Sequence, residues 1–525
     1  MTTRVFLALL TLALLLIVGL YVSASHLNND DIVFNTGYFD DLKALPLPQR
    51  LWLLLSNGDV GRGQFRTYGL ARVIQYLEIE ALGRSPLAVY GSIVALQLAS
   101  AAALYWALTR LVADSLARLL IAVIWFGNPF VLLISHTFHH YLYTVGPFLF
   151  LFIWIGLALN RPKTPWVIGA ALLNAAWLMG EAAIPSIYLL LLLGIVGAER
   201  KRPFLYQLAA VSLLLAAYIV YQRSVLYDPT LSRWTFVAPA SFDDAWYRAI
   251  HVFDRIFHDG RASVGLDYRD FDMPGGLVAG MEIYSNPLFW GALIALGGVA
   301  LWLPRQPGRI AATPLIAALL FAASTFSLYF LLYVATGAPP FTLRYMPPVG
   351  AVLVVTLVLL LGSLLRRPRL VAALSCVVLL CITTLGLWSL RQSVDADFND
   401  KVGRLIAARQ QGKTAVLIYN QLPEIGVPRV SGNYPALGSP YESAVNHPLA
   451  VMWTTHYYLW LVLGFQAIGS DYKEIDADSI DLMYGPSAVR VKKSDLVIVG
   501  MEPSPYPVYR PNFVWYRDWD EFLKR

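Results

Sequence analysis

Paired carboxylates after the first apolar segment are the residues of this chain best placed to perform chemistry. Asp30 and Asp31 follow two asparagines, and Asp40 and Asp41 come a few residues later. Where a membrane helix meets water, lipid and neighbouring charges oppose ionisation of a carboxyl group, so its pKa rises toward the range useful for acid–base catalysis. Asp30 and Asp31 therefore indicate a catalytic base, with the alternative that they only mark a helix end. Asp40 and Asp41 are interpreted as a solvated helix start and a fallback for that base.

Histidines are concentrated in a second short segment. Ser135–Tyr143 contains three of the eight histidines, namely His136, His139 and His140. His136 and His140 are four residues apart, so on a helix they would share a face, which is a spacing compatible with a pair of metal ligands. No third ligand is apparent in the sequence. Three interpretations stay open: an interfacial cluster with the neighbouring tyrosines, contact with a phosphate or sugar, and a metal site.

We expect membrane helices to position these residues, because the composition is typical of an integral membrane protein and of no other class of protein. Of 525 residues, 57% are hydrophobic and 14% are charged, and the mean hydropathy is +0.56, which excludes a soluble protein of this size. The formal charge of +6 comes from basic residues spread over short loops, which argues against nucleic-acid binding. Both cysteines, Cys376 and Cys381, fall within one apolar run. Neither a disulfide framework nor a cysteine-based metal site is therefore expected.

The sequence predicts eleven apolar segments that cross the roughly 30 Å hydrocarbon core of a bilayer. They are Val5–Val22, Val89–Leu111, Leu116–Ile134, Leu142–Leu159, Pro165–Met179, Ala182–Val196, Phe204–Tyr221, Pro287–Leu303, Ala311–Val334, Val349–Leu365 and Val371–Leu390. Gly180, Glu181 and Pro185 separate the fifth from the sixth. With a cytoplasmic N-terminus, every short basic loop then lies on the cytoplasmic side, as the positive-inside rule requires. We therefore predict a multi-pass protein of the bacterial inner or plasma membrane.

Two domains follow from this map. Residues 1–391 are predicted to form a transmembrane domain, whose longest outer loops are residues 25–86 and 222–286, and residues 392–525 are predicted to form an extracytoplasmic soluble α/β domain. The soluble domain is expected to begin with a helix at Phe398–Gln411 and to contain buried strands at Lys413–Tyr419 and Ser494–Gly500. Its role is predicted to be binding of the acceptor or guiding of the glycan.

The first outer loop is predicted to contain helices that lie in the plane of the membrane interface. Apolar side chains of residues 66–82 recur on one helical face, opposite Arg72, Gln75 and Glu78. Leu47–Leu55, entered through two prolines, is a second such segment.

The order of these features resembles the GT-C superfamily of membrane glycosyltransferases. The resemblance is closest to the dolichyl-phosphate-mannose protein mannosyltransferases and the bacterial aminoarabinose lipid-sugar transferases, and it covers roughly residues 1–220 well and the later spans by general plan. Its carriers are the acidic pair Asp30-Asp31, the run Phe65–Tyr68, Gly83 and Pro86, Asn128-Pro129, and the segment Leu178–Pro185 (LMGEAAIP).

The resemblance implies transfer of a sugar from a polyprenyl-phosphate-linked donor to a glycan, lipid or protein acceptor at the outer face of the membrane. Asp31, in preference to Asp30, would take the proton of the acceptor hydroxyl while the lipid phosphate leaves. Arg344 and Tyr345 lie at the outer end of the ninth span, where the family places residues near that phosphate, and a guanidinium binds phosphate oxygens in a bidentate manner. Arg66 is a second candidate. The alternative for both cations is simple anchoring at the interface.

The chain departs from the family pattern in two places. Many relatives carry an acidic residue in the segment of His136, His139 and His140, and this chain has none there. This departure argues against a metal ion held by a carboxylate; a divalent cation stays open, and no other cofactor is expected. The family often has lysine before the glutamate of LMGEAAIP, where this chain has Gly180, so Glu181 is predicted either to contact substrate or to cap a helix.

Other functional classes are weighed against the glycosyltransferase. A flippase or transporter of lipid-linked glycans would show internal repeats and charges near the membrane midplane, and the sequence shows neither. A polysaccharide polymerase or ligase would rely on outer arginines and histidines rather than on an acidic pair. A non-enzymatic scaffold does not account for Asp, His and Arg gathered on the outer side.

Overall fold

The structure is a computed structural model that separates into two compact units. Among the described residues, one unit contains the apolar helices up to Ser389, and the other contains the chain from Leu390 onward. The described residues are 3–23, 42–43, 45–57, 69–83, 86–132, 138–180, 183–198, 200–222, 224, 239–246, 347–365, 367–393, 399–420, 465, 467–469, 471–484, 487–502 and 512–524.

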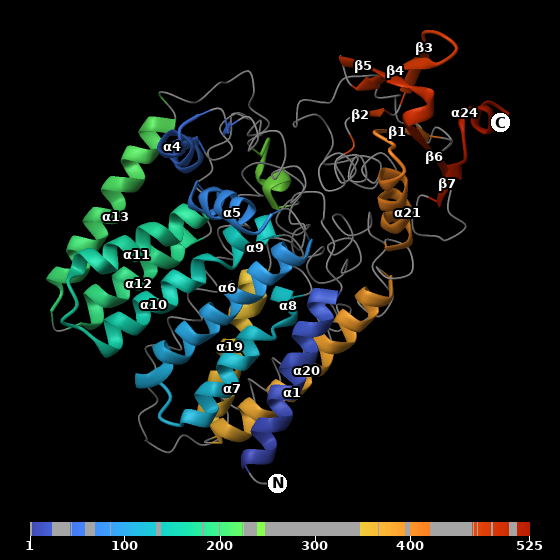
Figure 1. Cartoon of the computed structure of the whole chain (residues 1–525). Helices are drawn as coiled ribbons and strands as arrows, with labels where there is room; N and C mark the ends of the chain where they lie inside the picture. The colour runs from blue at the N-terminus through green and yellow to red at the C-terminus, as the bar shows by residue number, and fades with distance from the viewer. Residues whose placement is uncertain are drawn as a thin grey trace. The chain divides into compact units, whose positions relative to one another are not determined.

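The first unit is a bundle of apolar helices (Figure 1). Its long helices are α1 (Thr3–Ser23), α6 (Pro86–Ala107), α10 (Pro147–Asn160), α11 (Trp166–Met179), α12 (Ile184–Gly197), α13 (Arg202–Tyr221), α19 (Pro347–Leu364) and α20 (Pro368–Ser393). Four helical stretches are long and apolar enough to cross a membrane: Leu87–Arg110, Tyr141–Asn160, Arg202–Tyr221 and Pro368–Trp388. Two predicted spans, Pro287–Leu303 and Ala311–Val334, lie outside the described residues. The total of eleven spans stays a prediction.

The predicted interruption between the fifth and sixth spans is confirmed. Helix α11 ends at Met179, with Gly180 as its C-cap residue. Helix α12 begins at Ile184 and carries Pro185 in its first turn, where the missing N–H of proline costs no intrahelical hydrogen bond. The two short helices are therefore separate elements.

The predicted third span over Leu116–Ile134 is interrupted in the structure. Helix α7 (Ser115–Phe126) ends at Gly127, and the short helix α8 begins at Pro129 (Pro129–Leu132). Pro129 has no N–H to donate to the carbonyl oxygen of Trp125, four residues earlier, so the helix cannot continue through it. An apolar run of sufficient length predicts a span, but it does not predict this break.

Side chains from other helices donate hydrogen bonds to the backbone carbonyl groups that lose their helical partners at this break. Gln97 Nε2 of α6 donates to the carbonyl oxygen of Trp125 at 2.6 Å, in place of the missing N–H of Pro129. Thr383 Oγ1 of α20 donates to the carbonyl oxygen of Gly127 at 2.8 Å. Both bonds are buried, and buried backbone carbonyl groups require such partners because no water reaches them.

The same network extends to a third part of the chain. Tyr141 donates its hydroxyl proton to Gln97 Oε1 at 2.8 Å, and Trp125 Nε1 donates to Ser100 Oγ at 2.9 Å. Gln97 therefore connects the end of α7 to Tyr141 of α9 (Phe138–Thr144), the helix that also carries His139 and His140.

The second unit is an α/β domain, and its predicted elements are confirmed. Helix α21 spans Asn399–Gln410, and the predicted strands correspond to β1 (Ala415–Asn420) and β6 (Leu496–Glu502). Together with β2 (Ala467–Gly469) and β7 (Asn512–Tyr516) they form a sheet in the order β2-β1-β6-β7, in which only the β6–β7 pair is antiparallel. A second, antiparallel sheet consists of β3 (Asp471–Glu474), β4 (Ser479–Tyr484) and β5 (Ser487–Lys492).

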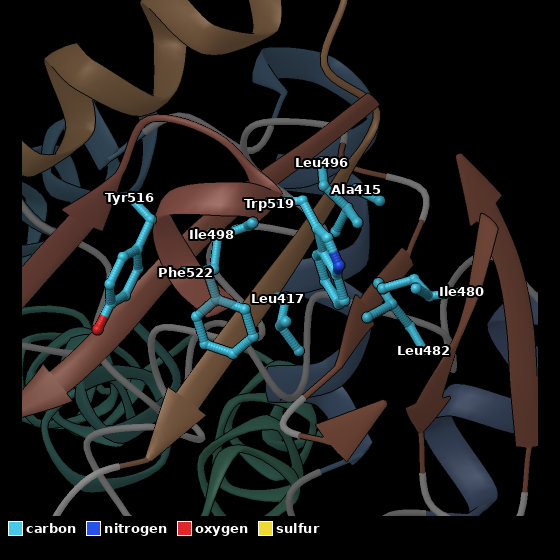
Figure 2. Close-up of a cluster of buried hydrophobic side chains, with 9 residues drawn as sticks. All are labelled: Ala415, Leu417, Ile480, Leu482, Leu496, Ile498, Tyr516, Trp519 and Phe522. Atoms are coloured by element: carbon cyan, nitrogen blue, oxygen red, sulfur yellow. The ribbon is translucent and has the colours of Figure 1, made fainter. Parts of the chain in front are cut away.

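Strand β1 is buried on both faces, which is why its sequence is continuously apolar. Ala415 and Leu417 point into a cluster with β4, β6, β7 and the C-terminal helix α24 (Trp519–Leu523), as Figure 2 shows. Val416 and Ile418 point to the opposite face, where α21 contributes Leu405. The nine residues of the first cluster are Ala415, Leu417, Ile480, Leu482, Leu496, Ile498, Tyr516, Trp519 and Phe522.

Candidate polar site at one end of the helix bundle

Two short helices of the first outer loop pack on each other at one end of the bundle. They are α4 (Leu47–Asn57) and α5 (Gly69–Leu82), as the sequence predicts. Their approach is close at Gly69, where an added Cβ would lie 1.9 Å from the carbonyl oxygen of Leu55. Arg50 Nη1 of α4 donates to the hydroxyl oxygen of Tyr76 of α5 at 2.8 Å. Glycine at position 69 is therefore required by space.

Contacts with the bundle identify which end these helices cover. The ring of Trp52 in α4 meets that of Tyr221, the last residue of α13, edge to face at 6.3 Å. Helix α5 contacts α6, α9 and α11, and Figure 1 shows it lying across their ends. In the topology predicted from the sequence this end is the outer one, and that orientation stays a prediction.

The bundle buries the polar side of α5. Arg72, Gln75 and Glu78 are exposed by only 3%, 0% and 8%, whereas Leu77 is 46% exposed. The helical periodicity predicted from the sequence is correct, but the polar side is covered by protein. The apolar side of α5 faces away from the bundle, which is the arrangement expected of a helix in a membrane interface.

Burial changes the charge state of Glu78. Neither of its carboxyl oxygens makes a hydrogen bond of normal geometry with a described residue. Desolvation raises the pKa of Glu78 to about 7, and the hydroxyl of Ser92 in α6 acts in the opposite direction. The carboxyl group is therefore half-protonated near neutral pH and able to give or take a proton.

A buried cation accompanies this carboxyl group on the same side of α5. Arg72 Nη1 donates to Gln75 Oε1 at 3.3 Å, and residues 72, 75 and 78 recur every three positions along the helix. A guanidinium, an amide and a proton-exchanging carboxyl group are thus presented together to the end of the bundle. The sequence reasoning missed Glu78 as a functional residue, although its position opposite the apolar side was visible.

Helix α9 and the residue before Glu181 meet at the same end. An added Cβ at Gly180 would lie 2.0 Å from the carbonyl oxygen of Tyr143 in α9. Gly180 is in extended conformation, so glycine is needed there for space. The histidine-containing segment and the segment LMGEAAIP, which are separate in sequence, are thereby brought together at Tyr143 and Gly180.

Most of the residues predicted from sequence to form the site lie outside the described part of the chain. Those residues are Asp30, Asp31, Arg66, His136, Glu181, Arg344 and Tyr345. His139 and His140 lie on α9, which contacts α5 and α6. Among the described residues, no group of three or more His, Cys, Asp or Glu side chains is arranged to hold a metal ion.

Replacing Glu78 with glutamine is expected to remove one component of the pH dependence of stability. The folded-state pKa of about 7 exceeds the model value of 4.5. The folded protein therefore holds more protons than the unfolded chain between these values, and native stability falls as pH rises through this window. The shift corresponds to about 3 kcal/mol in the free energy of unfolding. In thermal unfolding of the detergent-solubilised protein, the native chain should lose about this much stability between about pH 5 and pH 8. The Glu78→Gln variant should not show this loss.

Glu80 provides the matched control for this experiment. It lies two residues along the same helix, is exposed, and pairs with Lys43 Nζ at 3.5 Å. Glu80→Gln should follow the native pH dependence. Parallel pH curves for native protein and Glu78→Gln would show that Glu78 does not titrate in this range.

The arrangement at this end can bind an anion and exchange a proton, because it combines a buried guanidinium with a carboxyl group that is half-protonated near neutrality. Helix α5 supplies both groups, and α6, α9 and α11 hold α5 in place. In comparisons with protein-family models, with curated proteins and with solved structures, nothing matches the chain.

Proposed function

We propose that this protein is a membrane glycosyltransferase of the GT-C type. It transfers a sugar from a polyprenyl-phosphate-linked donor to a glycan, lipid or protein acceptor on the outer face of the membrane. The observation that carries the proposal is the buried polar side of α5, with Arg72, Gln75 and Glu78 turned into the bundle. Such groups are costly to bury and are characteristic of functional sites in membrane proteins.

Each group has a role in this reaction. The guanidinium of Arg72 offers planar recognition to the phosphate of the donor, as Arg344 and Tyr345 do in the predicted site. Asp31, or Asp30, is the base that takes the proton of the acceptor hydroxyl. Glu78 exchanges a proton at the same end of the bundle, where its pKa of about 7 keeps both protonation states populated.

The proposed topology supports this assignment. Eleven spans with a cytoplasmic N-terminus place the first outer loop, the histidine-containing segment and the α/β domain on the outer side. The donor lipid then lies in the outer leaflet with its phosphate at the level of α5, and the first outer loop faces the acceptor.

The test is a comparison of envelope glycans. Cells that lack the protein and cells restored with the native chain are analysed by mass spectrometry of their glycans, lipids and glycoproteins. We expect one sugar to disappear in the deletion strain and to return on restoration, while its lipid-linked donor accumulates on the outer leaflet. Identical glycans in both strains under conditions of verified expression would contradict the proposal.

A second candidate, a transporter of lipid-linked glycans, is favoured by one observation. Interrupted helices are typical of transporters, and the chain has such an interruption between α7 and α8 at Gly127 and Asn128. The same strains separate the two functions. A missing transporter leaves the donor on the cytoplasmic leaflet, whereas a missing transferase leaves it on the outer leaflet.

A further inference from the structure

A cleft opens at the opposite end of the bundle from α5. It has a volume of about 370 Å³, which lies within the range of small-molecule sites. It forms where α10 ends, α11 begins, α12 ends and α13 begins, and these helices lie next to one another in Figure 1.

The charge of the cleft has one sign. Arg161, Lys163 and Arg200 line it, and none of the lining residues is acidic. All three cations are exposed, and within the described part of the chain none has an ion-pair partner. The cleft therefore attracts anions, and the positive-inside rule assigns this end to the cytoplasmic face.

The floor of the cleft offers a buried hydrogen-bond donor. Gln207 is 7% exposed, and its Oε1 accepts from Trp154 Nε1 at 2.7 Å. Its Nε2 has no acceptor among the described residues. Gly169 lies against this amide group, since an added Cβ would stand 2.8 Å from it, so glycine leaves the space that the amide occupies beside the cleft.

Apolar walls complement the cations. The ring of Trp154 meets that of Phe204 edge to face at 6.2 Å, and Leu157 and Ala158 continue this wall along α10. A soluble anion gains little binding free energy from such walls, whereas the acyl chains and glycerol of a lipid are stabilised by contact with them. Helices α11 and α13 also begin here without side-chain caps or acidic residues in their first turns, which adds favourable N-terminal dipoles.

We infer that this cleft binds the headgroup of an anionic phospholipid of the cytoplasmic leaflet. The phosphate lies among Arg161, Lys163 and Arg200, Gln207 Nε2 donates to a headgroup oxygen, and the glycerol and upper acyl chain lie along Leu157 and Phe204. Basic pockets between membrane helices on the cytoplasmic side are recognised by such lipids. The inference does not depend on the proposed sugar transfer, because the cleft and α5 lie at opposite ends of the same helices.

The test measures lipid retention by the full-length protein. Protein purified in a neutral detergent is titrated with phosphatidylglycerol or phosphatidylcholine, and bound lipid is counted by native mass spectrometry. Arg161→Gln, Lys163→Gln and Arg200→Gln are each expected to weaken phosphatidylglycerol binding about 5-fold, with no change for phosphatidylcholine. Ala158→Phe fills the cleft without changing charge and should also weaken binding.

Arg110→Gln is the matched control, because Arg110 is an exposed cation at the predicted cytoplasmic end that does not line the cleft. Retention by this variant should equal that of the native chain. Equal losses for Arg110→Gln and Arg161→Gln would overturn the inference in favour of unspecific surface charge. Displacement of the lipid by inorganic phosphate or glycerol phosphate at equal concentration would overturn it in favour of a site for a soluble anion.

Discussion

Asp31→Asn is expected to lower the rate of sugar transfer by about 10²- to 10⁴-fold, with unchanged amounts of protein in the membrane. Asparagine preserves the size of the side chain but cannot accept the proton of an acceptor hydroxyl. Proton removal positioned in the transition state contributes a factor of this order. The measurement is the initial rate of transfer to the acceptor in membranes of the restored strain, with Asp30→Asn measured beside it.

Two acids of the same loop serve as controls for this prediction. Asp40→Asn and Asp41→Asn change the same functional group in the same stretch of sequence, and both are expected to leave transfer within about two-fold of native. If both Asp30→Asn and Asp31→Asn transfer at the native rate, the acidic pair only marks a helix boundary, and the transporter becomes the better assignment. Loss in Asp41→Asn instead would move the base to the second pair.

Gln97→Leu is expected to destabilise the helix bundle by about 2 to 6 kcal/mol. The substitution removes the donor to the carbonyl oxygen of Trp125 and the acceptor of the hydroxyl group of Tyr141. Each buried polar group that is left without a partner costs about 1 to 3 kcal/mol, and Pro129 provides no N–H that could replace the lost donor. The measurement is thermal or denaturant unfolding of the purified protein in detergent.

A double-mutant cycle with Tyr141→Phe checks the cause. Tyr141→Phe removes only the hydroxyl group that donates to Gln97 Oε1 at 2.8 Å. If that bond exists, the double variant is less destabilised than the sum of the two single variants, because the bond is lost only once. If the two single destabilisations add up to that of the double variant, the hydrogen-bond network is contradicted. The same holds if Gln97→Leu is as stable as the native protein.

The α/β unit follows from its sequence more completely than the membrane unit does. Lys413–Tyr419 is apolar without alternation because β1 is buried on both faces, and this pattern identifies a central strand directly. The pairing of β1 with β2 and β6, and of β6 with β7, was not predicted, since partners distant in sequence leave no local signal. In the membrane unit, the break after Met179 was predictable because glycine, a carboxylate and proline coincide there.

Two features of the membrane unit escaped prediction for a common physical reason. Periodicity located α5, but it does not state whether water, lipid or protein covers the polar side, and the bundle buries Arg72 and Glu78. Likewise, the sequence of the predicted third span is one apolar run. The break at Pro129 is stabilised by Gln97 and Thr383, which donate hydrogen bonds to the backbone carbonyl groups there. Both outcomes depend on side chains from other helices. The predicted site residues outside the described part of the chain stay predictions.

The hydrogen bond between Thr383 and Gly127 also has a consequence for the order in which the protein is made. These residues are 256 positions apart, and at about 5–20 residues per second the ribosome needs about 10–50 s to cover that distance. Helix α7, with 12 residues, is about 18 Å long and too short to span a bilayer alone. The carbonyl group of Gly127 therefore receives its hydrogen-bond donor only after α20 has been synthesised, so the first helices are made before their final packing partners exist. Completion of this part of the bundle is a late event in the synthesis of the chain.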